Sequence, residues 1–419
     1  MAESLSRGVC ILSHAHPDFS KGGGELAAYY QFTTQRAAGQ RVVFVAASET
    51  ATQYASSRPI EMVLRHAPDE FLYTFSGMAE DRLAWNDPQQ RRVLVEFLAG
   101  LDCSVYHLHH YWRIGVDLIV DLMVARPDAR FVLTLHEMLA ICLHHGQMVK
   151  TRSRELCRQD SPMRCLACFP EQTLERFILR KAALLHTLRR FDQLFYPSQF
   201  IRDRYEAWGL TGPRAEVLEN YLGSATHGAP PPPPMPADPA RAAHFGFFGQ
   251  PTAFKGLDVL LRALPLALRS RPDIVLTVYG AEREDLLRPF PSLDPLVEDL
   301  GAAVTFTGRY NPADAVSLMR GVGWVIVPSI WWENSPVVIQ EARHAGTPLI
   351  VSGIGGMAEK VLPGIDGLHF QRASGVDLAR AMVQAADPAL HQAMASTVRP
   401  VIDRAAFLDA LNAAYSPLA

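Results

Sequence analysis

The sequence predicts an α/β protein with two doubly wound domains, each built on a mainly parallel sheet. Short apolar runs alternate with helix-length segments, which is typical of parallel strands in βα units. The chain has 419 residues, enough for about two to three domains. Residues 223–240 read GSATHGAPPPPPMPADPA, and the run of prolines favours a stiff polyproline II spacer.

Ten apolar runs, rich in Val, Ile and Phe, are candidates for buried strands. Half of them precede the proline run and half follow it, so each half of the chain can form its own sheet. The runs are residues 9–12, 41–46, 105–108, 131–135, 193–196, 244–248, 274–278, 303–306, 323–327 and 348–351.

The domain boundaries follow from these runs. We expect an N-terminal Rossmann-like domain over residues 1–222, with a cysteine-bearing insert at about 138–172. A proline-rich linker over 223–240 leads to a C-terminal Rossmann-like domain over 241–400. Residues 401–419 are expected to form a helix that packs back on the first domain. A ligand for an aromatic groove of another protein is the alternative interpretation of the prolines.

Composition excludes some classes of function. A net charge of −3 and a pI near 6.6 give no basic footprint for nucleic acid. The apolar run at residues 9–12 is too short for a secretory signal, and no apolar stretch reaches the ~20 residues of a membrane span. The expected compartment is the cytoplasm, where thiols stay reduced.

The strongest motif is WWENSPVVIQEARHAGTPLIVSGIGGMAEKV, which starts at Trp331 and follows a predicted strand. Ser335 is a typical N-cap and Pro336 a typical first helical residue, so a helix N-terminus is expected at a strand end. Its unpaired N–H groups suit a diphosphate. Glu333 lies in the loop and Glu341 in the helix, where a carboxylate can accept hydrogen bonds from ribose hydroxyls. A surface helix with two solvated glutamates is the alternative.

Two further loops follow predicted strands. FFGQPTAFKGLDVLLRAL, from Phe247, places Lys255 where an ammonium could reach phosphate. HAHPDFSKGGGELAAYYQ, from His14, holds a run of three glycines, Gly22 to Gly24, whose backbone can approach phosphate or sugar closely. Without the strongest motif, an ordinary solvated loop would be the better interpretation of Lys255, and a glycine-rich turn alone is weak evidence for a ligand.

Together these motifs resemble glycosyltransferase family 4. The resemblance is dense over residues 308–367, where Glu333 and Glu341 meet the Glu-x7-Glu spacing. It includes Lys255, the segment PSQFIRDRY from Pro197, Asn220 and the glycine loop, and it is looser before residue 130. It implies the GT-B fold, in which two Rossmann-like domains face each other across a cleft, and transfer with retention of the anomeric configuration.

The resemblance implies roles for individual residues. Glu341 would bind the donor ribose, Glu333 would face the donor sugar near its anomeric centre, and Lys255 would neutralise the diphosphate. The family often has Arg at the position of Gln250, and an amide brings no charge. The other candidates for donor binding are Gly23, Gly24, Asn334, Ser335, Pro336 and Val337.

Histidines end two predicted strands of the first half. His109, in VYHLHHYW, resembles the family histidine beside the donor sugar, so it joins Glu333 and Lys255 as a catalytic candidate. Alternation places His107 on the same side as His109. The candidates for the acceptor side are His107, His110 and His136. A metal site formed by the histidines with Glu137 is the alternative.

The predicted function is therefore a retaining glycosyltransferase. It would move a sugar from a nucleotide-sugar donor to a glycan or lipid-linked acceptor. No metal is expected at the reaction centre, because no Asp-x-Asp motif stands at a strand end in the second half. The alternatives are a GT-B sugar-nucleotide epimerase and a catalytically weak glycosyltransferase-like binding protein, which Gln250 would favour.

Four cysteines cluster in the insert. Cys142, Cys157, Cys165 and Cys168 include a Cys-x-x-Cys pair, and four thiolates suit a tetrahedral structural Zn²⁺. Free thiols and disulfides are the alternatives. A basic helical stretch follows, around Arg176, Arg180 and Lys181. It would either contact the inner face of an anionic membrane or form a solvated helix face.

Overall fold

The computed structural model describes residues 8–20, 22–48, 62–74, 77–223 and 238–416. The chain divides into two compact units, one formed by Met1–Ser224 with Ile402–Ala419 and the other by Ala225–Val401. We call them the N-terminal and C-terminal units. Most of the predicted proline linker, residues 224–237, lies outside the described residues.

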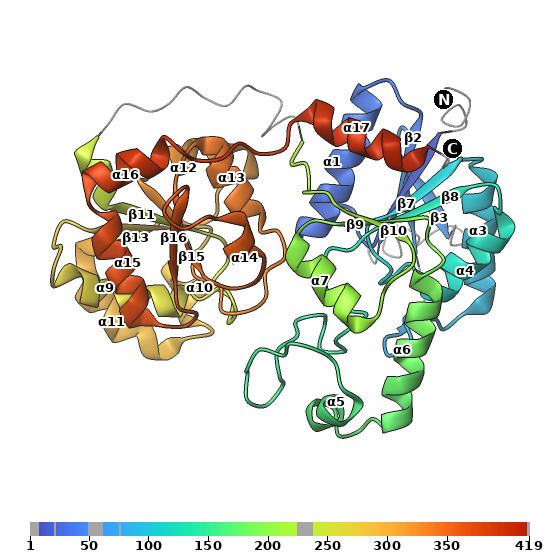
Figure 1. The fold of residues 1–419 in the computed structure, drawn as a ribbon, viewed down its shortest axis with the longest axis horizontal. Helices are drawn as coiled ribbons and strands as arrows, with labels where there is room; N and C mark the ends of the chain where they lie inside the picture. Colours follow the sequence, from blue (N-terminus) through green and yellow to red (C-terminus); the bar gives the residue numbers. More distant parts are fainter. Residues whose placement is uncertain (1–7, 21, 49–61, 75–76, 224–237, 417–419) are drawn as a thin grey trace, which may run out of the picture. The chain divides into compact units, whose positions relative to one another are not determined.

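The N-terminal unit is built on an eight-stranded sheet in the order β10-β9-β8-β7-β1-β2-β4-β3 (Figure 1). Neighbouring strands are parallel except for β3, which runs antiparallel to β4 at one edge. The strands are β1 Val9–Ser13, β2 Val42–Ala47, β3 Val63–Ala67, β4 Glu70–Tyr73, β7 Val105–Leu108, β8 Arg130–Thr134, β9 Gln193–Tyr196 and β10 Arg214–Val217. A separate two-stranded ribbon pairs β5 Met78–Ala79 with β6 Ala84–Trp85.

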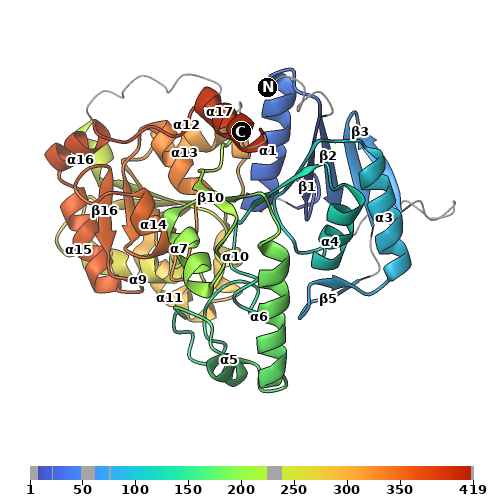
Figure 2. The same cartoon turned by 45° about the vertical axis from the view of Figure 1, so that its right-hand side comes forward.

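The helices of this unit pack on the sheet or extend from it. They are α1 Gly23–Ala37, α3 Pro88–Gly100, α4 Val116–Ala125, α5 Pro162–Cys168, α6 Leu174–Leu188, α7 Gln199–Trp208 and α17 Arg404–Tyr415. Figure 2 shows α6 extending away from the sheet, with α5 near its first turn. The last helix, α17, buries Phe407, Leu411 and Tyr415 in the same hydrophobic cluster as Phe32 and Phe44, so the end of the chain completes this core.

The C-terminal unit has a six-stranded, fully parallel sheet in the order β13-β12-β11-β14-β15-β16. Its strands are β11 His244–Phe248, β12 Val275–Tyr279, β13 Val304–Phe306, β14 Trp324–Val327, β15 Leu349–Ser352 and β16 Gly367–Phe370. Its α-helices are α9 Leu257–Leu268, α10 Arg283–Leu287, α11 Asp294–Leu300, α12 Ala315–Arg320, α13 Val337–Ala345, α14 Gly355–Lys360, α15 Gly375–Ala385 and α16 Pro388–Ala395. Short 3-10 turns are η1 Pro239–Ala243, η2 Pro291–Leu293, η3 Gly301–Ala303 and η4 Pro312–Asp314.

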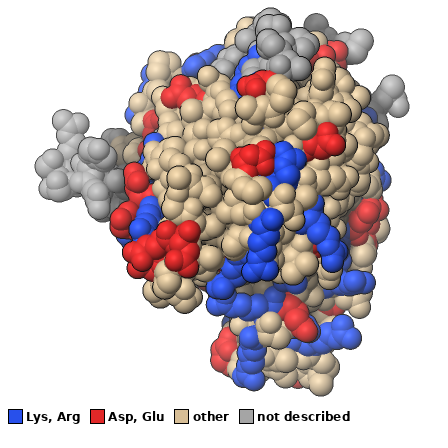
Figure 3. All heavy atoms as spheres, turned by 90° about the vertical axis from the view of Figure 1, so that its left-hand side faces the viewer, with Lys and Arg blue, Asp and Glu red and all other residues tan. Residues whose placement is uncertain are grey.

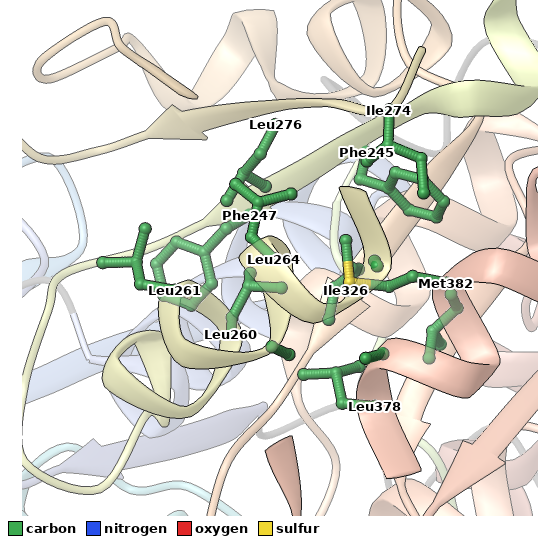
Figure 4. Close-up of a cluster of buried hydrophobic side chains, with 14 of the residues drawn as sticks. Phe245, Phe247, Leu260, Leu261, Leu264, Ile274, Leu276, Ile326, Leu378 and Met382 are labelled. Carbon is green, nitrogen blue, oxygen red and sulfur yellow. The ribbon is translucent and has the colours of Figure 1, made fainter. Parts of the chain in front are cut away.

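One hydrophobic core joins this sheet to the helices on one of its faces. In Figure 4, Phe245 and Phe247 of β11 meet Leu260 and Leu264 of α9, with Met382 of α15 beside them. The two phenylalanines are two positions apart on the strand, so both point to the same face of the sheet. Burial of each such side chain stabilises the fold by about 1.5–3 kcal/mol.

All ten predicted strands form, and the α/β class is confirmed. The sequence-based prediction missed β3, β4, β10 and β16 of the two main sheets and the short ribbon strands β5 and β6. The edge strands β3 (VLRHA) and β10 (RAEV) carry polar and charged side chains and are largely half-buried or exposed, so they lack the apolar signal of central strands.

Candidate functional site

Glu333 and Lys255 form an ion pair beyond the carboxyl-terminal ends of the two central strands of the C-terminal sheet. Lys255 Nζ lies 2.7 Å from Glu333 Oε1, which also accepts hydrogen bonds from Ser329 Oγ at 2.9 Å and Trp331 Nε1 at 2.8 Å. Glu333 is only 8% exposed. Burial acts to raise its pKa, but the charge of Lys255 and the three hydrogen bonds outweigh burial and lower that pKa. The carboxylate is therefore held ionised and fixed in position.

Adjacent strand ends bring the two residues together. Strands β11 and β14 are parallel neighbours, so the loops that follow them both start at the carboxyl-terminal ends of the strands. Gly256 has φ +71°, and a Cβ there would stand 2.0 Å from the carbonyl oxygen of Pro328. Only glycine permits this approach between the loop that carries Lys255 and the loop that carries Glu333.

A third loop closes on the same place. It follows β15 and opens α14, where the Gly356 amide donates to the Glu333 carbonyl at 2.8 Å. A Cβ on Gly356 would stand 1.5 Å from the Asn334 carbonyl oxygen. The glycine-rich turn after β15 therefore packs its backbone against the backbone of the Glu333 loop and helps to fix that loop in position.

Helix α13 begins at Val337, one residue later than the sequence predicts. Pro336 is extended (φ −62°, ψ 124°) and occupies the N-cap position, so the prediction that Ser335 caps the helix is wrong. The Ser335 hydroxyl instead accepts a hydrogen bond from Gln340 Nε2 at 3.2 Å. With no side-chain cap, the first N–H groups of α13 stay available for an anion. Asn334, Ser335 and Val337 around this terminus are half-exposed.

Glu341 lies within α13 and is half-buried. It has no hydrogen bond or ion pair with any residue that the structure describes, apart from an electrostatic interaction with Tyr310. Burial raises the pKa of Glu341 to about 7. A carboxyl group that is kept from water without a protein partner is suited to bind ligand hydroxyls.

Gln250 is exposed directly after Gly249 at the end of β11. Its carbonyl accepts from the Thr252 amide at 2.9 Å, which shapes the turn toward Lys255. The Lys255 side chain is 39% exposed although it is paired. Its ammonium can therefore contact a ligand without leaving Glu333.

His107, His109 and His136 of the N-terminal unit belong to one hydrogen-bonded network. His107 Nδ1 lies 2.9 Å from Gln31 Nε2 and 2.8 Å from the Tyr415 hydroxyl of α17. Gln31 Oε1 lies 3.1 Å from His109 Nε2, so His107 and His109 contact the same amide, as the strand alternation predicts. Burial lowers the pKa of both histidines, that of His107 to about 3, so both rings are neutral.

Both ring nitrogens of His109 are used inside this network, because its Nδ1 lies 3.0 Å from His136 Nε2. His136 is half-buried and stands 3.6 Å from the position of a Cβ on Gly24. The pKa of His136 is lowered to about 3 by burial. His136, rather than His109, is thus the member of the pair nearer the surface, next to the glycine loop.

His110 points elsewhere. Its Nδ1 accepts from the amides of Tyr111 and Trp112 at 2.9 and 2.8 Å, and its Nε2 lies 3.2 Å from Glu137. Burial raises the pKa of Glu137 to about 8. Within the described residues, the histidines and Glu137 do not bring three ligand atoms within 4.8 Å of one another.

The four cysteines of the insert border a single cavity of about 260 Å³. Cys165 and Cys168 lie on α5, which has no buried residue, and Cys142 is the most enclosed thiol, with its pKa raised to about 11 by burial. Cys157 Sγ donates to the Gln159 carbonyl at 3.1 Å. In the described part of the chain no three of these thiols lie within 4.8 Å of one another.

Several residues of these sites were missed from the sequence. Ser329 and Trp331 hold Glu333, and the Trp-Trp pair at the head of the strongest motif was the available signal. Gln31 belongs to the hydrogen-bonded histidine network, and the ring of His14 packs against that of His110. His14 lies 3.3 Å from Glu25, and its Nδ1 is buried with no hydrogen-bond partner in the described structure. Its place directly after β1, before the glycine loop, was the signal for it.

The strand order of the C-terminal sheet defines an α/β fold of the Rossmann type, with the Lys255–Glu333 pair at the ends of its strands. Residues 242–387 match the family model described as glycosyl transferases group 1. The chain is 25% identical to the glycogen synthase of Mycobacterium tuberculosis, over 93% of this chain and 89% of that protein. It is 35% identical to the D-inositol 3-phosphate glycosyltransferase of Corynebacterium urealyticum, over 31% of each.

Solved structures extend the likeness to the fold of the whole chain. HepE of Anabaena, in complex with UDP, matches with a TM-score of 0.64 and 17% identity, covering 97% of this chain and 98% of that one. Sucrose-phosphate synthase of Thermosynechococcus elongatus matches with a TM-score of 0.66 and 18% identity over the same shares. The fold is therefore GT-B, and the predicted resemblance to glycosyltransferases is confirmed. None of the helices in the described residues has the length and apolar character needed to cross a membrane.

Proposed function

We propose that the protein is a retaining glycosyltransferase that moves a sugar from a nucleotide-sugar donor to a glycan or lipid-linked acceptor. The observation that carries the proposal is the Lys255–Glu333 pair beside the uncapped N-terminus of α13. Related proteins support the donor class, since HepE of Anabaena was solved in complex with UDP and with UDP-glucose.

The proposed roles follow from the charges. The ammonium of Lys255 and the N–H groups of α13 would hold the donor diphosphate and stabilise the negative charge that grows on it as the glycosidic bond to phosphate breaks. Glu341 would accept hydrogen bonds from the ribose hydroxyls. Glu333, ionised and rigid, would face the donor sugar and favour positive charge at its anomeric carbon.

The transfer itself needs no protein nucleophile in this proposal. The acceptor hydroxyl forms the new bond on the face from which the diphosphate departs, the departing oxygen keeps the bonding electrons, and a phosphate oxygen takes the hydroxyl proton. Retention of configuration follows from attack on that face. The protein contributes by holding both substrates together and by stabilising the leaving group.

Among the candidate histidines of the N-terminal unit, His136 best suits the binding of uncharged sugar hydroxyls. Its ring is neutral and half-buried, whereas His107, His109 and His110 are buried with both ring nitrogens in contact with protein groups. We assign His136 and Gly24 to direct contact with the sugar. His109 would instead hold His136 in position, because its two ring nitrogens contact Gln31 and His136.

A lipid-linked acceptor would be reached through the insert. Met163, Ile178 and Leu179 are large apolar side chains exposed on α5 and α6. The lower part of the face drawn in Figure 3, at the height of α5 in Figure 1, shows several Lys and Arg side chains. Arg164 and Arg176 are also exposed on α5 and α6, and exposed apolar and basic side chains on one segment suit an anionic membrane surface. Binding to vesicles that contain anionic lipid should fall in an Ile178→Ser, Leu179→Ser variant, whereas unchanged binding would exclude this surface.

The proposal includes a structural metal ion in the insert but no metal ion at the reaction centre. The reaction centre needs no divalent ion, because Lys255 and α13 supply the positive charge, so a chelator of Mg²⁺ and Mn²⁺ should leave transfer intact. The four cysteines, which border one cavity, would converge on one structural Zn²⁺ when it binds. Strict dependence of transfer on added Mg²⁺ would contradict the first statement.

The decisive experiment is a calorimetric screen of nucleotide sugars, beginning with UDP-glucose, followed by product analysis with the tightest donor. An α-linked product from an α-linked donor supports retaining transfer, and a β-linked product contradicts it. A converted sugar nucleotide formed without any acceptor would indicate an epimerase. Donor binding with no product across an acceptor panel would indicate a binding protein.

A further inference from the structure

A separate cluster of metal-ligating side chains lies at the loop after β1. His16, Asp18 and His66 each bring one ligand atom within 4.8 Å of the others, and this is the one such group among the described residues. Asp18 Oδ2 lies 2.8 Å from His66 Nε2 and 3.5 Å from His16 Nδ1. Ligand atoms around a tetrahedral zinc ion stand about 3.3 Å apart, so small side-chain shifts would complete the geometry.

The hydrogen bonds of His16 fix which of its two nitrogens carries the lone pair that a metal ion would need. Its Nε2 lies 3.1 Å from Glu70 Oε2, and because a carboxylate only accepts, Nε2 carries the hydrogen. Its Nδ1 accepts from the Asp18 backbone amide at a long 3.2 Å, so Nδ1 presents its lone pair toward Asp18. Histidines that bind a metal ion usually donate their other ring N–H to a carboxylate, as His16 does to Glu70.

The surroundings hold the first ligand rigidly and leave the others accessible. His16 is 1% exposed, and its ring packs against Tyr29 and Phe44. Glu70 is itself buried, and its other oxygen lies 3.4 Å from the Tyr29 hydroxyl. Asp18 and His66 reach solvent. An ion can therefore enter from water and meet one preformed ligand and two adjustable ones.

We propose that His16, Asp18 and His66 bind one divalent first-row transition-metal ion, with Zn²⁺ the expected species and water completing its coordination. Imidazole nitrogen with carboxylate oxygen is the donor set of such ions and is a poor one for Mg²⁺ or Ca²⁺. The ion is distinct from the zinc assigned to the four cysteines and from the reaction centre.

The ion would clip two segments of the N-terminal unit together. His16 and Asp18 lie on the segment that leads from β1 to Gly23 and Gly24 at the start of α1, whereas His66 lies on the edge strand β3. Without the ion, the described side-chain contacts of His66 with this segment are a hydrogen bond to the exposed Asp18 and ring contacts with His16 and Phe19. A bound ion would restrain the glycine loop and protect the edge of the sheet.

The test uses the full chain stripped of metal and titrated with Zn²⁺ by calorimetry. His66→Ala should remove one equivalent of bound zinc, and Glu70→Gln should weaken the same equivalent by about 10–100-fold. His186→Ala, which removes an exposed histidine on α6, is the matched control and should keep the parental stoichiometry. Cys165→Ser should retain this equivalent, which separates it from the cysteine ion.

Hydrogen exchange supplies a readout that does not depend on transfer activity. Zinc should slow exchange in peptides that cover residues 14–20 and 62–67 of the parent, and it should have no such effect in His66→Ala. Equal zinc stoichiometry in the parent and His66→Ala would overturn the proposal. Zinc-dependent protection that persists in the variant would overturn it equally, and the cluster would then be an ordinary ion pair of Asp18 with His66.

Discussion

At the scale of single residues, the charge of Glu333 depends on its neighbours. A carboxylate as buried as Glu333 stays ionised only when cations and hydrogen-bond donors replace water. Lys255, Ser329 and Trp331 all converge on its Oε1. The pair that we propose to bind the donor is therefore also a source of pH-dependent stability.

Replacing Lys255 by Ala should destabilise the protein mainly at neutral pH. Paired Glu333 has a pKa below 4.5, so it adds stability above pH 4.5 that is lost as pH falls. Without Lys255, burial should raise that pKa, and the deficit, about 1–3 kcal/mol at pH 7, should shrink below about pH 4.5. Chemical denaturation across pH measures it.

The control for this experiment is Lys150→Ala, which removes the exposed pair of Lys150 with Glu155 at 2.7 Å. That change should leave the unfolding curves unaltered at every pH, because water screens exposed charges. A deficit in Lys255→Ala that is independent of pH would mean that lost packing, and not the charge of Glu333, accounts for it.

Glu341→Gln should weaken nucleotide binding about tenfold or more, since about 1.5–3 kcal/mol is lost with a charged hydrogen bond. The pKa of Glu341 is about 7, and only its ionised form accepts in full. UDP affinity of the parent should therefore rise as pH increases through 7, while the variant should lose this rise. Calorimetry at pH 6 and pH 8 checks both, and equal affinities of parent and variant would remove the ribose role.

At the scale of elements, α5 lacks the usual source of helix stability. It has seven residues, and none of them is buried, so packing alone gives it little support. Two of its residues are the cysteines that border the cavity of the insert. A metal bound by Cys165 and Cys168 would supply the missing free energy, because metal binding to such a segment is coupled to its folding.

Cys165→Ser should therefore loosen the insert and leave the rest of the N-terminal unit intact. Amide exchange of residues 142–168 should become faster, and one equivalent of zinc should be lost by elemental analysis. Met163→Ser, on the exposed face of the same helix, is the control and should change neither quantity. Parent protein made with zinc present that holds less than about a tenth of an equivalent would exclude a tight structural ion.

At the scale of the whole molecule, the chain returns to its first unit. Residues after Val401 leave the C-terminal unit, and α17 buries Phe407, Leu411 and Tyr415 beside strands from the start of the chain. The Tyr415 hydroxyl reaches His107, 308 residues earlier in the sequence. The stability of the histidine network thus depends on the last helix.

Leu411→Ala should destabilise the N-terminal unit by about 2–5 kcal/mol, because it opens a cavity at a fully buried position. Exchange measured peptide by peptide should rise in residues 8–223 and stay unchanged in residues 238–401. Leu362→Ala, at an exposed position of the C-terminal unit, is the matched control and should have little effect. Faster exchange in both units would show that they unfold together.

Much of the fold was predictable because buried parallel strands are apolar over four to six residues, and all ten such runs became strands. Glycine and proline marked the loops of the C-terminal site for the same local reason. The edge strands β3 and β10 were missed since their side chains carry little apolar signal. The start of α13 was placed one residue early because Ser335 bonds to Gln340 and does not cap the helix.

The sequence by itself determined where chain segments are buried and which loops follow strands, since periodicity and backbone preference are local properties. Only the tertiary structure decided which of those loops meet. Lys255 finds Glu333 across 78 residues because β11 and β14 are neighbours, and Gly356 fits Asn334 because β15 is next in the sheet. Likewise, neither the Gln31 contact that occupies His109 nor the approach of His66 to Asp18 has a local signal, because strand order brings these residues together.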